Sequence, residues 1–248
     1  MAQVPYTKIA GLPPEAQRQI QRDFEEILVL IAAAGGSSAP SFYTSDSFDR
    51  AGSTTDLQTT DAAFGGTSLA WATTGTGTWG ICNTATPTAS KFAWYSTDFT
   101  GWKTAEVDVG FIDVAIQMSF AVIGSASDSY GIVARVTDNS NFYFFVIDVG
   151  PAGTTFNWRV GKVVAGAETT LFSQAVSLTS GGTATLKLTL VGSVLTAYGN
   201  GVAIWVGSDT AHSVQTKHGF GTYHGGGAGA GGSHTSVLRF DNLWITAP

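Results

Sequence analysis

Residues 194–206 of this 248-residue chain read Val-Leu-Thr-Ala-Tyr-Gly-Asn-Gly-Val-Ala-Ile-Trp-Val. Two short, mostly apolar runs flank an Asn-Gly pair at positions 200–201. A type I′ turn needs positive φ at both central residues, and Asn and Gly adopt that conformation most readily. The stretch therefore predicts a β-hairpin and indicates a fold built from antiparallel strands joined by tight turns.

Strand-like alternation recurs on both sides of this hairpin. Apolar residues at every second position predict strands with one buried and one solvated face. The alternating sets are Val114, Ile116, Met118 and Phe120, then Phe156, Trp158 and Val160, and then Leu186, Leu188 and Leu190. We expect roughly a dozen strands in two packed sheets. The aromatic residues expected in the core are Trp79, Phe145, Trp158 and Trp244.

A helical pattern occurs only near the N-terminus, over residues 15–34. Its apolar seam, at helical spacing, consists of Ile20, Phe24, Ile27 and Ile31. Leu28, Val29 and Leu30 make the second half apolar nearly all round, which a lone surface helix would not be. The helix therefore needs the sandwich, sister helices or another protein as a partner. Isoleucine at both kinds of seam position favours three or more helices.

These patterns divide the chain into three parts. Residues 1–36 are expected to form an anchor or oligomerisation helix with Ile20, Phe24, Ile27, Leu28 and Ile31 as its contact residues. Residues 37–42 are the linker, and residues 43–248 form the strands. The expected fold is mainly β, an antiparallel two-sheet sandwich preceded by one N-terminal α-helix.

Composition narrows the classes of partner. Only 12% of residues are charged and the net charge is −6, without a run of Lys and Arg. Nucleic-acid binders usually carry a basic footprint, so we expect no nucleic-acid partner. The longest apolar stretch, residues 27–34, is far shorter than the ~20 residues that span a bilayer, so no membrane insertion is expected. A single cysteine, Cys82, excludes an intrachain disulfide.

Five short motifs follow one another between residues 43 and 247. They are Asp-Ser-Phe-Asp-Arg at 46–50, Thr-Gly-Thr-Trp-Gly-Ile at 76–81, Gly-Ile-Val-Ala-Arg-Val at 131–136, Tyr-Gly-Asn-Gly at 198–201 and Arg-Phe-Asp-Asn-Leu at 239–243. In this order they resemble the concanavalin A-like lectin/glucanase superfamily, near its laminin G-like members. The resemblance implies a jelly-roll sandwich whose last strand pairs beside its first.

Retaining glucanases of that superfamily carry Glu-x-Asp-x-Glu on one strand. Residues 106–111 here read Glu-Val-Asp-Val-Gly-Phe. By this resemblance Glu106 matches the nucleophile and Asp108 its helper, whereas Gly110 replaces the acid/base. Retaining hydrolysis needs a nucleophile carboxyl and an acid/base carboxyl, and the acid/base is missing here. We therefore expect no enzyme and no catalytic residues. The strand is instead expected to point Glu106 and Asp108 outward and to bury Val107, Val109 and Phe111.

A glycan site needs aromatic rings that stack on sugar C–H faces, with polar groups beside them for the hydroxyls. The candidates at or near expected turns are Trp102, Tyr130, Asp138, Asn139, Asn141, Tyr223 and His224. Some laminin G-like domains bind calcium, for which the loop or strand-end acids are Asp128, Asp138 and Asp148. We nevertheless expect no cofactor and no metal site.

The order of the parts resembles a second group of proteins. An acidic helix and linker ahead of such a sandwich is similar to bacteriophage virion proteins such as tail fibres, head fibres and decoration proteins. This resemblance implies a virion structural protein made in the host cytoplasm, a homotrimer attached to other virion proteins through its N-terminal region, with cell-surface glycan as a partner. A glycan-active hydrolase with an atypical site, or a ligand-free cementing protein, are the alternatives.

Overall fold

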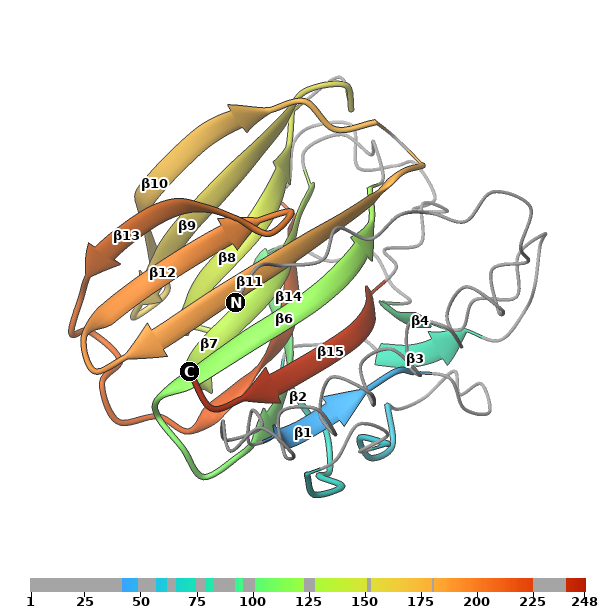
Figure 1. Ribbon diagram of the computed structural model, residues 1–248, viewed down its shortest axis with the longest axis vertical. Helices are drawn as coiled ribbons and strands as arrows, with labels where there is room; N and C mark the ends of the chain where they lie inside the picture. The colour runs from blue at the N-terminus through green and yellow to red at the C-terminus, as the bar shows by residue number, and fades with distance from the viewer. Residues whose placement is uncertain are drawn as a thin grey trace, which may run out of the picture.

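The computed structural model describes residues 42–48, 57–61, 66–74, 79–82, 92–95, 101–122, 128–150, 153–179, 181–224 and 240–248. Their strands form two antiparallel sheets (Figure 1). The expected N-terminal helix, with Ile20, Phe24, Ile27, Leu28 and Ile31, lies outside the described residues. Within the described ranges, no helix is long and apolar enough to cross a membrane.

One sheet has eight strands. They are β1 (Phe42–Asp46), β3 (Trp79–Cys82), β4 (Phe92–Tyr95), β6 (Val114–Ala121), β11 (Thr183–Val191), β12 (Val194–Gly199), β13 (Val202–Ser208) and β15 (Phe240–Thr246). Their order is β13-β12-β11-β6-β15-β4-β3, and β1 also pairs with β15. Phe42 lies opposite Thr246 in that pair, so the last strand returns beside the first, as the resemblance implies.

The other sheet has seven strands. They are β2 (Ala72–Thr74), β5 (Gly101–Asp108), β7 (Asp128–Asp138), β8 (Asn141–Val149), β9 (Phe156–Val164), β10 (Ala167–Val176) and β14 (Lys217–His224). Their order is β10-β9-β8-β7-β14-β5-β2. Figure 1 shows β8, β9 and β10 behind β11, β12 and β13, so the two sheets form the layers of a jelly-roll sandwich.

The space between the sheets holds one large apolar core. All ten residues of the three expected alternating sets are buried in it, which confirms the strands and the faces they present. Rings from both sheets meet around Phe220 of β14. Its ring centroid lies 5.1 Å from that of Trp79 on β3 and 4.7 Å from that of Phe240 on β15. Phe48 and Trp71 complete this aromatic group at 5.6 and 5.0 Å.

Two core predictions were wrong, while Trp79, Phe145 and Trp158 are buried as expected. Trp244 is only partly buried, because its neighbours Leu243 and Ile245 take the inward positions of β15. Phe111 is 51% exposed, although Val107 and Val109 are in the core. The strand ends at Asp108 and Gly110 turns the chain with a φ of 74°, so alternation no longer applies at Phe111.

The turns and edges follow the local chemistry. Asn200 and Gly201 have φ angles of 49° and 81°, which confirms the hairpin expected at this pair. On one side of the sandwich the outermost strands are β10 and β13. Each carries one extra residue relative to its partner, at Leu171 in β10 and at Ile204 in β13. The rings of Phe172 and Trp205 stack across these two strands with centroids 6.3 Å apart.

Candidate functional site

The seven-stranded sheet is apolar on both faces. Along β8, Tyr143, Phe145 and Ile147 point into the core between the sheets, whereas Phe142, Phe144 and Val146 belong to a separate cluster on the opposite face. All six side chains are buried. The outer face of a two-layered antiparallel sandwich is commonly solvated, so this buried outer face is the unusual surface of the domain.

Aromatic rings from three strands meet on this outer face. The ring of Trp102 on β5 lies 4.9 Å from Phe144 and 5.1 Å from Phe142, both on β8. Tyr223 on β14 lies 5.3 Å from Trp102 and is partly exposed, whereas Trp102 is 7% exposed. Together with two charged residues described next, these rings form what we call the outer-face cluster, made of Trp102, Phe142, Phe144, Arg159, Glu168 and Tyr223.

The two charged members of the cluster, Arg159 and Glu168, contact its rings and each other. Glu168 on β10 accepts a hydrogen bond from Trp102 Nε1 at 3.1 Å and forms an ion pair with Arg159 on β9. The Arg159 guanidinium lies 4.9 Å from the centre of the Phe144 ring, within cation–π range. Its Nη2 donates to Ser129 Oγ at 3.2 Å and lies 3.5 Å from Asp148 Oδ1. The cluster therefore combines closely packed, mutually inclined rings with the Glu168 carboxylate, which accepts hydrogen bonds.

A glycine on β9 makes room for the central ring. A Cβ atom at Gly161 would lie 2.3 Å from Phe144 Cζ and 2.6 Å from the Thr169 carbonyl oxygen. Only a residue without a side chain lets the Phe144 ring lie against the backbone there. The position of the Phe144 ring, with the Arg159 guanidinium over it, therefore depends on Gly161.

Glu106 lies on the same outer face of β5 as Trp102, four residues further along the strand. It is 1% exposed and its Oε2 accepts a hydrogen bond from Thr104 Oγ1 at 2.8 Å. Burial raises the pKa of this carboxyl, while the Thr104 hydroxyl and the charge of Lys217 act in the opposite direction. The outward direction expected for Glu106 is correct, but the side chain is buried rather than solvated.

The other positions of the glucanase-like triplet do not join Glu106 in a buried site. Asp108 is exposed, and its Oδ1 accepts hydrogen bonds from Thr216 Oγ1 at 2.6 Å and from the Gly110 backbone N–H at 3.0 Å. The hydrogen bond from Thr216 lowers the pKa of Asp108. Gly110 lies beyond the end of β5 in a left-handed turn, so a side chain at this position would not continue the row of the strand.

The structure brings two of the expected glycan-binding residues together and removes a third. Trp102 and Tyr223 are neighbours in the outer-face cluster. Tyr130 points the other way, into the core beside Phe120, with 1% exposure, so the expectation that it contacts a glycan was wrong. The sequence predicts Tyr130 near a turn, but β7 begins at Asp128, and Tyr130 already pairs with Thr222 inside the sheet.

The polar glycan-binding candidates at the turn between β7 and β8 make hydrogen bonds that stabilise the turns. Asp138 Oδ1 accepts hydrogen bonds from Ser140 N at 2.7 Å and Asn141 Nδ2 at 2.9 Å, and Asn141 Oδ1 accepts one from Ala165 N at 2.9 Å. Asn139 is exposed in the same turn. His224 ends β14 opposite Gly101, and its side chain lies outside the described part of the structure.

The two candidate calcium-binding acids whose side chains the structure describes, Asp138 and Asp148, do not converge. Asp138 precedes the start of β8 and Asp148 lies near its end, so the length of the strand separates them. Asp148 is engaged by Ser129 Oγ at 2.5 Å and lies near Arg159. The side chain of Asp128 is outside the described residues. The described acids therefore do not form the shared oxygen cage that calcium requires.

Sequence reasoning missed Phe144, Arg159 and Glu168. One signal was available: residues 142–147 read Phe-Tyr-Phe-Phe-Val-Ile, and an unbroken apolar run predicts a strand buried on both faces. Arg159 and Glu168 had no such signal. In the β9–β10 ladder Arg159 lies opposite Ser173 and Glu168 opposite Val163, so their ion pair runs diagonally and does not follow the register.

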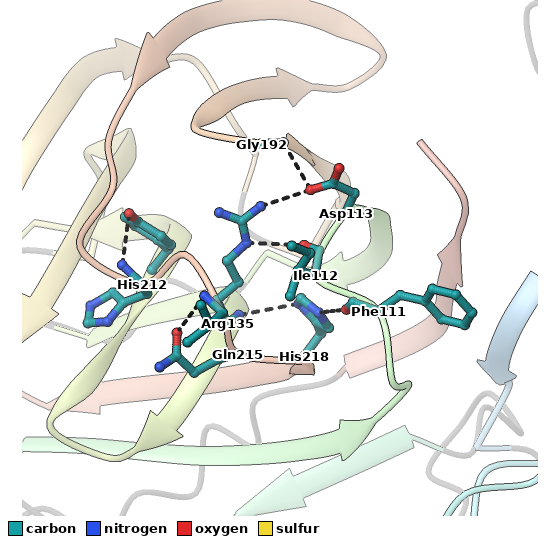
Figure 2. A network of polar contacts seen from close by, with 10 residues as sticks. Phe111, Ile112, Asp113, Arg135, Gly192, His212, Gln215 and His218 are labelled. Carbon is teal, nitrogen blue, oxygen red and sulfur yellow. Dashed lines mark hydrogen bonds and ion pairs between the residues drawn. The ribbon is translucent and has the colours of Figure 1, made fainter.

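A second polar network braces one end of the sandwich (Figure 2). The fully buried Arg135 donates from Nε to the Ile112 carbonyl oxygen at 3.1 Å and from Nη2 to Asp113 Oδ1 at 3.2 Å. The backbone N–H of Gly192 also donates to Asp113 Oδ1, at 2.9 Å. The network therefore fixes the loop between β5 and β6 against the turn between β11 and β12.

His218 completes this network. Its Nδ1 accepts the backbone N–H of Arg135 at 3.3 Å, so the proton is on Nε2, which donates to the Phe111 carbonyl oxygen at 3.0 Å. Burial lowers the pKa of His218 to about 4. The ring is thus neutral at physiological pH and serves as a structural hydrogen-bonding group.

The fold defines the class of the domain, an antiparallel two-sheet jelly-roll β-sandwich. It is similar to the carbohydrate-binding module CBM66 from Bacillus subtilis, with 15% identity, a TM-score of 0.51, and coverage of 71% of this chain and 95% of that one. It is also similar to the GH43 protein BlXynB from Bacillus licheniformis, with 13% identity, a TM-score of 0.51, and coverage of 83% and 39%. These identities show the fold alone. The sequence matches no protein-family model and no curated protein.

Proposed function

We propose that the chain is a non-enzymatic virion structural protein whose sandwich binds a host-surface glycan on its outer face. The observation that carries the glycan part is the outer-face cluster, in which the partly exposed Tyr223 lies against Trp102, and the Trp102 indole N–H donates to the carboxylate of Glu168. Rings that stack on sugar C–H faces and carboxylates that accept hydroxyl protons are the two requirements of glycan recognition. The similarity of the fold to a carbohydrate-binding module supports the proposal.

Tyr223→Ala is expected to weaken glycan binding about fivefold, because a stacked ring contributes on the order of 1 kcal/mol. An array of bacterial surface polysaccharides probed with the full chain identifies the ligand, and calorimetry then measures Kd. Tyr198→Ala is the matched control, because Tyr198 is a partly exposed tyrosine on the eight-stranded sheet. Equal loss in both variants, or none in either, would place binding elsewhere.

A second candidate, a hydrolase with an atypical site, is favoured by Glu106, whose raised pKa and burial are typical of a general acid. The missing carboxyl at Gly110 supports the non-enzymatic proposal instead, because Asp108, the other carboxyl beside Glu106 on β5, is exposed and hydrogen-bonded to Thr216. The glycans bound on the array serve as substrates in a reducing-sugar assay. Release that Glu106→Gln abolishes would replace the first proposal with the second.

The virion part of the proposal rests on the acidic helix and linker ahead of the sandwich. Light scattering on the full chain is expected to give a trimer, and Ile27→Asp is expected to give a monomer, because a charge in the seam would be buried between helices. Gln21→Asp, outside the seam, is the control. If the unsubstituted chain is itself a monomer, the helix is not a self-association element and docking onto another protein becomes the better explanation.

A further inference from the structure

Exposed apolar side chains gather at the end of the sandwich that the Arg135 network braces. We call them the end patch, and they are Phe111, Ile112, Val191, Val194 and Val214. Their exposed fractions run from 38% for Ile112 to 73% for Val214. Such a concentration of large apolar side chains at one place on the surface marks an interaction site.

Hydrogen bonds hold the parts of the end patch together. Asp113, next to Ile112, accepts the N–H of Gly192, which lies between Val191 and Val194. Thr216, two residues after Val214, accepts the N–H of Val109, two residues before Phe111. Loops that are far apart in the sequence are therefore fixed side by side, and the patch exists as one surface in the folded domain.

The N-terminal part of the chain enters the sandwich at this same place. The first described residue is Phe42, and the ring of Tyr43 stacks on Phe111 with centroids 4.1 Å apart and planes 8° from parallel. Residues 35–41 separate this point from the expected helix and reach at most about 23 Å when extended. A helix over residues 15–34 would be about 30 Å long, so its apolar second half can lie directly on the end patch.

The expected helix also has apolar side chains that could cover the end patch. Its seam at Ile20, Phe24, Ile27 and Ile31 accounts for one face, but Val29 and Leu30 lie outside that seam. Because the tether is short, a helix over residues 15–34 would meet the patch at about millimolar effective concentration, which a free partner protein would not reach. The chain's own leader is therefore the occupant that the geometry favours.

We propose that residues 15–34 dock as a helix on the end patch of their own sandwich, through the apolar surface outside the seam. The proposal does not depend on glycan binding. Docking fixes the direction in which the sandwich projects from whatever the seam contacts. It also places the outer face, with Trp102 and Tyr223, in a constant orientation to that anchor.

Hydrogen–deuterium exchange on the full chain tests this directly. Amides of residues 15–34 are expected to be protected, and Ile112→Glu or Val191→Glu should speed their exchange about tenfold, because a charge would have to be buried under the helix. Val202→Glu is the matched control, since Val202 is a similarly exposed valine on β13, outside the end patch. Amides of β8 report in the same data that each variant remains folded.

Three results would overturn the proposal. The leader amides could be unprotected in the unsubstituted chain, or their protection could be the same in the patch variants as in Val202→Glu. Protection that disappears on dilution would show that the leader of a neighbouring copy, rather than the chain's own, covers the patch.

Discussion

We expect Phe220→Ala to lower the free energy of unfolding by about 3–5 kcal/mol, because a large aromatic side chain is removed from a packed core. Phe220 is fully buried and its ring contacts four others, from Phe48, Trp71, Trp79 and Phe240. The loss affects both sheets at once, because β14 belongs to one and β3 and β15 to the other. Chemical denaturation monitored by tryptophan fluorescence measures the change, since two of the four contacting rings are tryptophans.

Tyr198→Ala provides the comparison for this measurement. The Tyr198 side chain lies on the face of β12 that points away from the core, beside Lys187, and it is partly exposed. Removing this side chain is therefore expected to change the free energy of unfolding by no more than about 0.5 kcal/mol. Similar losses from Phe220→Ala and Tyr198→Ala would mean that the aromatic group does not join the two sheets.

The stability of the fold should fall as the pH drops from 6.5 to 4. The pKa of buried His218 is about 4, against an ordinary value of 6.5. Between these values the unfolded chain takes up a proton that the folded chain does not, so unfolding is favoured by up to about 3 kcal/mol at pH 4. Above pH 6.5 the ring is neutral in both states and the contribution is constant.

Denaturation at a series of pH values measures this effect. Burial is the largest cause, and the charges of Arg135 and Asp108 act on His218 in opposite directions. His218→Gln retains a donor for the Phe111 carbonyl but does not titrate, so its free energy of unfolding should depend less on pH in this range. Parallel curves for the two proteins would show that His218 does not carry the dependence.

The core of the sandwich could be predicted from the sequence because strands that bury one face reveal themselves by period 2. Val114 to Phe120 and Leu186 to Leu190 follow this rule and are buried as expected. The rule fails where a strand ends, and Phe111 lies beyond the turn at Gly110. It also fails for β8, because a strand buried on both faces has no alternation to detect.

The candidate site was harder to predict because its members come from strands that are not neighbours in sequence. Trp102 and Tyr223 could be proposed as aromatic residues near turns, but Tyr130 met the same criterion and faces the core. Only the sheet order, which places β14 between β5 and β7, decides which rings share a face. The diagonal ion pair between Arg159 and Glu168 depends on side-chain reach, which no spacing in the sequence encodes.

The extra residues at Leu171 and Ile204 have a consequence for behaviour in crowded solution. A regular, uncharged edge strand is a template on which another copy of the chain can add a strand, and β13 contains no charged residue. An unpaired residue in each outermost strand interrupts the regular array of N–H and C=O groups and increases the local twist. Neighbouring copies held close together can therefore remain separate sandwiches instead of merging into a continuous sheet.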